Sequence, residues 1–148
     1  MIRIFILCTS LALCSCQTIS INTPSGRPEV TAKSSISRAK TTAIHMMASA
    51  GYSLASQSEN TLTFECQMPP GDAALYLIAV GNSYYSQPVW TTRFTFVPVG
   101  NEVKIYGTVK ASAQGPFGQI QSTDLTTGKA GQQLQQLLEE IRRRVNSR

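Results

Sequence analysis

Two stretches of the chain place apolar residues at helical spacing. Between Ser34 and Ala50 apolar side chains recur every three or four residues and form one stripe: Ile36, Ala39, Ala43, Ile44, Met47 and Ala50. Ser34 or Ser35 can cap the start of this segment, and Gly51 suits its end. The second stripe begins near Thr127–Ala130 and ends near Asn146: Leu134, Leu137, Leu138, Ile141 and Val145. The pattern therefore predicts two amphipathic helices, one toward each end of the chain.

The first helical stripe also predicts where the single histidine lies. At about 100° per residue, His45 falls opposite Ile36 and shares its face with polar residues. We therefore expect His45 to face solvent, as an ordinary surface residue.

Alternating patterns between the two helices predict strands. Tyr52–Ser58 is a weak candidate, whereas Thr61–Gln67 alternates clearly and places Leu62, Phe64 and Cys66 on one face. A hairpin follows around Val99–Glu102. One face of the hairpin carries mostly apolar or small residues, from its first strand and then its second: Trp90, Thr92, Phe94, Phe96, Val103, Ile105, Gly107, Val109 and Ala111.

The segment Ala73–Val80 is apolar throughout, so its period cannot distinguish a buried strand from a short helix. We interpret it as a strand. The order is then helix, about five strands, helix, with short connections that favour antiparallel pairing. The sequence predicts an α+β fold: a two-layer sandwich, with a mainly antiparallel sheet and the N- and C-terminal helices on one face. This order of elements is loosely similar to that of the helix-grip domains of some assembly-machinery lipoproteins, and fold alone does not assign function.

The N-terminus has the features of an export signal. Arg3 precedes the apolar run Ile4–Leu13, which is shorter than the roughly 20 residues that a membrane span requires. The next residues, Leu13-Cys14-Ser15-Cys16, resemble the lipobox of bacterial lipoproteins. The resemblance implies that Cys16 becomes the first mature residue, is thioether-linked to diacylglycerol and receives a fatty acid such as palmitate. The alternative is an ordinary cleaved signal in which the cysteines are incidental.

These features divide the chain into three parts. Residues 1–15 form the signal peptide, residues 16–30 the lipidated N-terminus and a tether rich in turn-forming residues, and residues 31–148 a single domain. The alternative interpretation of the segment around Ile19 and Ile21 is a short edge strand. Gln17 follows the lipidated cysteine, whereas Asp is the usual inner-membrane retention signal in the lipoproteins that this chain resembles. The expected location is therefore the outer membrane of a Gram-negative host, facing the periplasm.

Charge and cysteine content limit which binding partners and which disulfide bonds are expected. The formal net charge of +5 falls by one when Arg3 leaves with the signal, which is too weakly basic to favour nucleic acid. Contact with anionic head groups or acidic partners remains open. Of four cysteines, only Cys66 is left free in the mature domain, so no internal disulfide framework can form. We expect Cys66 on the core side of its strand, as an inert small hydrophobe.

The sequence contains no recognisable catalytic or metal-binding motif. A zinc site needs three or four ligands, and the mature chain offers one histidine and one free cysteine. No Gly-x-Ser-x-Gly or phosphate-binding glycine loop occurs. No spacing brings two of the carboxylates Glu65, Asp72, Glu102 and Asp124 together. We therefore expect no catalytic residue, no metal and no cofactor.

Two surface features are candidates for contact with other molecules. Arg142, Arg143 and Arg144 could meet anionic lipid head groups, or could simply favour the helix C-terminus and pair with Glu139 and Glu140. Tyr84 and Tyr85, in an otherwise polar loop, could bind a partner or cover the core.

Together these observations indicate an envelope lipoprotein, anchored to a membrane by its lipid and acting as a non-catalytic binding or accessory domain for an envelope protein partner. Two alternatives are a hydrolase of an envelope polymer and an exclusion or immunity lipoprotein carried by a plasmid or phage. The sequence leaves the partner and the oligomeric state open.

The lipobox yields a direct prediction. Cys16→Ser removes the only thiol at the predicted acylation position, so the variant should lose incorporation of labelled fatty acid and should be mislocalised or released. Cys14→Ser is the matched control and should keep the label. Continued labelling of the Cys16 variant would contradict the assignment.

Overall fold

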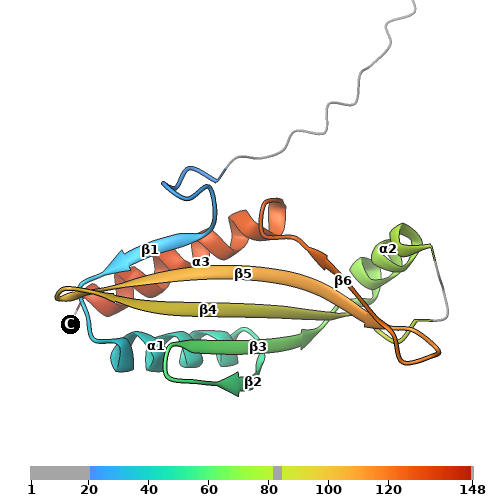
Figure 1. The fold of residues 1–148 in the computed structure, drawn as a ribbon, viewed down its shortest axis with the longest axis horizontal. Helices are drawn as coiled ribbons and strands as arrows, with labels where there is room; N and C mark the ends of the chain where they lie inside the picture. The colour runs from blue at the N-terminus through green and yellow to red at the C-terminus, as the bar shows by residue number, and fades with distance from the viewer. Residues whose placement is uncertain (1–20, 82–84, 148) are drawn as a thin grey trace, which may run out of the picture.

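Six antiparallel strands form one sheet, and two helices lie across one of its faces (Figure 1). The computed structural model describes residues 21–81 and 85–147. The elements in chain order are β1 (Glu29–Ala32), α1 (Ile36–Ser49), β2 (Ser53–Gln57), β3 (Thr61–Gln67), α2 (Pro70–Val80), β4 (Val89–Val99), β5 (Glu102–Gln114), β6 (Ile120–Asp124) and α3 (Lys129–Asn146). The predicted α+β architecture, with terminal helices beside an antiparallel sheet, is confirmed.

The hairpin of β4 and β5 forms the middle of the sheet. The strands pair along their whole length, and Gly100 starts the two-residue turn with a φ of 59°, the conformation that a type II′ turn requires at this position. β3 and then β2 continue the sheet beyond β4. On the other side, β1 pairs with Val103–Tyr106 and β6 with Lys110–Gln114, so two short strands share one edge of β5.

The predicted helix faces pack on the sheet. Ser35 caps α1 by accepting a hydrogen bond from the Arg38 amide, and α3 presents its apolar stripe to β1 and β5. The inward residues of the helices are Ala39, Ala43, Met46, Met47, Gly131, Leu134, Leu138, Ile141 and Val145. Met46 is buried and Ala50 is exposed, which turns the face of α1 slightly from the predicted stripe. His45 is exposed, as expected.

The helix α3 also covers the free edge of β1. The Gln135 side-chain amide accepts a hydrogen bond from the Glu29 amide at 2.8 Å and donates one to the Glu29 carbonyl at 3.1 Å. Asn146, eleven residues later on the helix, accepts a hydrogen bond from the Lys33 amide at 3.0 Å. These side chains take the place of a neighbouring strand, so the exposed edge of β1 is blunted.

The interpretation of Ala73–Val80 as a strand is wrong, because this segment belongs to α2. Pro70 occupies the first turn, where its missing amide costs no hydrogen bond, and Gly81 ends the helix with a φ of 75°. Ala73 packs with Met68 and Ala111 in a second, small apolar cluster. α2 therefore lies outside the predicted two-layer sandwich, at one end of the sheet (Figure 1).

The N-terminal boundary of the domain also differs from the expectation. Glu29 and Val30 belong to β1, although the tether was expected to run to residue 30. Ile21 is buried, and its Cδ1 lies beside Gly131 at the start of α3. The turn-forming residues between them form a loop that returns the chain to the sheet edge, with the Gly26 amide donating to the Thr23 carbonyl. The alternative strand at Ile19 lies outside the described residues.

Core and surface positions should respond differently to truncation. Phe94 and Leu138 are fully buried, so Phe94→Ala and Leu138→Ala should each lower the free energy of unfolding by about 2–5 kcal/mol. His45→Ala, at the exposed face of α1, should change it by less than about 0.5 kcal/mol. Denaturant titration measures all three, and a His45 variant as unstable as the other two would contradict the described orientation of α1.

Candidate functional site

Two hollows meet at Trp90, the only tryptophan of the chain. The inner hollow, of about 140 Å³, lies between the sheet, the end of α1 and the first half of α3, lined by Met47, Ala50, Tyr52, Trp90, Thr92, Val109, Ala130, Gln133, Leu134 and Leu137. The outer hollow, of about 370 Å³, opens between α2 and the start of α3, lined by Met68, Asp72, Leu75, Tyr76, Trp90, Leu125, Gly128, Lys129, Ala130 and Gln133. Because Trp90, Ala130 and Gln133 line both, we treat them as one site, the Trp90 groove.

The lengths of the helices create this groove. α1 ends at Ser49 and α3 begins at Lys129, whereas β4 and β5 continue past both helix ends (Figure 1). The sheet face that carries Trp90 is therefore only partly covered, by the end of α1 and the first half of α3. α2 closes the far side, where the Tyr76 hydroxyl donates to the Ala111 carbonyl at 3.2 Å and holds the helix against the sheet.

The wall of the inner hollow carries no charge at neutral pH. Burial raises the pKa of the Tyr52 hydroxyl above its ordinary value, the neighbouring Cys66 thiol raises it further, and a hydrogen bond with Thr92 opposes both. Tyr52 therefore remains a neutral phenol. Charges appear only at the rim of the outer hollow, where Asp72 and Lys129 contribute to the lining. Apolar walls with a few polar groups are typical of binding sites.

A compact corner before α3 fixes the floor of the groove. The Thr126 amide donates to the Asp124 carboxylate at 2.8 Å, and the buried Thr126 hydroxyl accepts from the Val109 amide at 3.1 Å. The hydrogen bonds from Thr126 lower the pKa of the Asp124 carboxyl. The Thr126 carbonyl lies so close to Gly131 that a side chain there would overlap it. The corner thus sets where α3 begins.

The residues singled out from the sequence lie in different places. Cys16 and Tyr84 lie outside the described residues. Tyr85 is half-buried, and its hydroxyl donates to the Gln121 side-chain oxygen at 3.1 Å. Cys66 shares the core face of β3 but is only half-buried, because it lies opposite Trp90 beside the groove, beyond the end of the helix layer.

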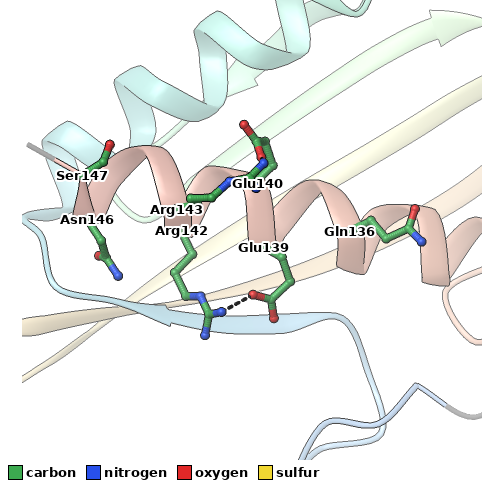
Figure 2. A pocket seen from close by; sticks show the side chains of 7 residues that line it. All are labelled: Gln136, Glu139, Glu140, Arg142, Arg143, Asn146 and Ser147. Atoms are coloured by element: carbon green, nitrogen blue, oxygen red, sulfur yellow. Dashed lines mark ion pairs between the residues drawn. The ribbon is translucent and has the colours of Figure 1, made fainter.

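The arginine group lies at the opposite end of α3 and is paired within the helix (Figure 2). Arg142 forms an ion pair with Glu139 at 2.5 Å, and Arg143 and Arg144 both pair with Glu140. The hollow here is larger, about 690 Å³, but it is an open depression with polar and charged walls. Two glutamates offset two of the three positive charges, so the cluster is a weak attractor for an anionic surface.

Among residues 21–81 and 85–147, no three His, Cys, Asp or Glu side chains approach closely enough to hold a metal ion. Glu139 and Glu140 line one depression, but both are paired with arginines. Within the same described part of the chain, no helix is long and apolar enough to cross a membrane.

Comparisons with known protein families, with characterised proteins and with solved structures find no match to this chain. The evidence for function therefore lies in the site itself.

Sequence reasoning placed Trp90 on the correct face but missed the groove. The available signal was Trp90 itself, a single large aromatic residue on the core face at the start of β4, far from the turn at Gly100. Recognising it as a site required knowing that α2 is a helix and that α1 and α3 end beside Trp90.

The corner before α3 can be tested with two glycines. An alanine Cβ at Gly131 would lie 1.7 Å from the Thr126 carbonyl oxygen, so Gly131→Ala must displace backbone and should cost about 1–3 kcal/mol of unfolding free energy. At Gly128, the N-cap of α3, the nearest atom would be 3.8 Å away, so Gly128→Ala meets no overlap and should cost less than Gly131→Ala, at most about 1 kcal/mol. Thermal unfolding compares the two, and equal stabilities would contradict the close approach.

Proposed function

We propose that this chain is a lipid-anchored envelope protein that faces the periplasm, held at the outer membrane through Cys16, and that its domain binds an envelope protein partner without catalysing a reaction. The observation that carries the binding part is the Trp90 groove, an apolar recess next to a half-buried tryptophan. The residues that contribute most binding energy to protein interfaces are enriched in tryptophan and tyrosine, and they cluster in desolvated pockets. The lipobox Leu13-Cys14-Ser15-Cys16 supports the anchor.

The dimensions of the groove favour an apolar side chain of a partner over an enclosed small molecule. Small-molecule pockets usually measure about 300–1,000 Å³ and surround their ligand. The inner hollow, at about 140 Å³, is smaller than this. The outer hollow, at about 370 Å³, is large enough but is open to solvent on one side, so it does not surround a ligand. The two together suit one anchoring side chain in the inner hollow, with the backbone of its segment lying along the outer one.

The groove offers little support for the hydrolase alternative. Hydrolysis of a glycosidic bond requires two carboxyl groups flanking the scissile bond, about 5–10 Å apart. Only Asp72 contributes a carboxyl group to the groove lining, and it lies at the rim with Lys129. The paired glutamates of α3 belong to the other depression. A binding role explains the apolar walls and does not require a second carboxyl group, which the groove lining lacks.

Site-specific cross-linking tests the binding role. Gln133 lines both hollows, and Gln136, one turn further along α3, lines the arginine depression instead. A photoreactive benzoylphenylalanine at Gln133 of the full chain in cells should yield a defined protein adduct. The same residue at Gln136 is the matched control and should not yield that adduct.

A groove-filling variant sharpens this test. Ala130 lines both hollows, so Ala130→Phe should remove the Gln133 adduct, while thermal unfolding and membrane fractionation show that the protein remains folded and anchored. Identical adducts from Gln133 and Gln136, or an adduct unaffected by Ala130→Phe, would contradict binding in the groove.

A further inference from the structure

The most exposed large apolar side chains of the described residues gather at one end of the molecule. Leu75 and Ile78 on α2 are 68% and 77% exposed, and Phe117 and Ile120 in and after the β5–β6 turn are 93% and 74% exposed. α2 and this turn both lie at the end of the sheet opposite the β4–β5 turn (Figure 1). We call these four residues the apolar end.

The outer face of α2 is unusual for a helix at a protein surface. Leu75 and Ile78 are one turn apart and share that face with the exposed alanines Ala74 and Ala79. Asp72, in the first turn, is the only charged residue of the helix. Surface helices normally carry polar residues on the side that faces water. Water is therefore a poor environment for this face of α2.

The chain upstream of the described residues limits what can cover the apolar end. Ile21 packs beside Gly131, at the start of α3 and next to Gly128–Ala130 of the groove lining. Cys16 is five residues before Ile21, and five residues span at most about 18 Å. If Cys16 carries the lipid, the bilayer surface must lie within that reach of the start of α3. The C-terminus of this helix, with its arginines, lies about 27 Å further along its axis.

We propose that the apolar end rests on the bilayer that holds the anchor, with Leu75, Ile78, Phe117 and Ile120 inserted at the boundary between head groups and acyl chains. This inference rests on the proposed lipidation of Cys16. The eleven residues of α2 are too few to span a bilayer, so its exposed apolar face can enter only the boundary region. Lys129, at the groove rim beside Leu75, then lies at the level of the phosphate groups.

This orientation gives the Trp90 groove a defined direction. Leu75 belongs both to the apolar end and to the lining of the outer hollow. The mouth of the groove therefore opens beside the bilayer, and the segment it receives comes from a partner at the membrane surface. The arginines of α3 are directed away from this bilayer, toward the periplasm.

Lipid-quenching measurements test the contact. Single cysteines replace Ile78 or Phe117 in the full mature chain with Cys66→Ser, and each is labelled with the environment-sensitive fluorophore NBD. The protein is reconstituted in vesicles of phosphatidylethanolamine and phosphatidylglycerol that contain a spin-labelled phospholipid. Asn101→Cys, exposed at the opposite β4–β5 turn, is the matched control. The emission at positions 78 and 117 should be shifted to the blue and largely quenched, whereas that at position 101 should be unaffected.

Intact-mass analysis of the same samples separates the two proposals. A lipidated Cys16 with no quenching at positions 78 and 117 would overturn the bilayer contact and leave the anchor standing. A blue shift without lipid quenching would mean that protein, such as a second copy of the chain, covers the apolar end, and would also overturn the contact. If Cys16 carries no lipid, the anchor fails. The measurement is then repeated with Cys16→Ser, so that only one cysteine is labelled, and quenching by added vesicles decides whether the apolar end contacts lipid.

Discussion

The close approach of α3 to the middle of β5 is the contact on which the rest of the structure depends. Gly107 makes it possible, because a Cβ at this position would lie 2.9 Å from Leu134 Cδ2 and 3.2 Å from Leu138 Cδ1. Because β5 has no side chain at Gly107, Leu134 and Leu138 of α3 contact the sheet directly. The helix axis is then close enough to the sheet for Gln135 to form hydrogen bonds with the backbone of β1. One missing side chain thus sets both the depth of the core and the cover of the sheet edge.

The same helix determines where the sheet remains open. The tight corner between Thr126 and Gly131 fixes the start of α3 beside Trp90, so the helix layer covers only part of the long central hairpin. The uncovered part is closed partly by α2, whose own packing on Met68 and Ala111 is modest. The Trp90 groove therefore lies where the main apolar core meets the small cluster under α2. It results from the arrangement of these elements and not from a local sequence motif.

Patterns that recur over several turns or residues predicted their elements well. The stripes of α1 and α3, the alternation of β3 and the β4–β5 hairpin all have enough repeats to fix type and facing. β1 and β6 were missed because they are short, and because much of their stability comes from pairing with β5 and, for β1, from Gln135. α2 was misread because an apolar run without a polar face has no period, and because it forms part of the candidate site, the site could not be predicted either.

If the domain is held by its N-terminus, as proposed, the contacts around Glu29 have a mechanical consequence. A force applied to the N-terminus would act first on the loop after Ile21 and then on the start of β1. There the backbone of Glu29 is bound by Gln135 on one side, the preceding Pro28 carbonyl accepts from Gly107 on the other, and the Glu29 carboxylate pairs with Lys104 at 3.2 Å. These contacts connect the start of β1 to both α3 and the central strand β5, so a force on an N-terminal anchor would be shared between them.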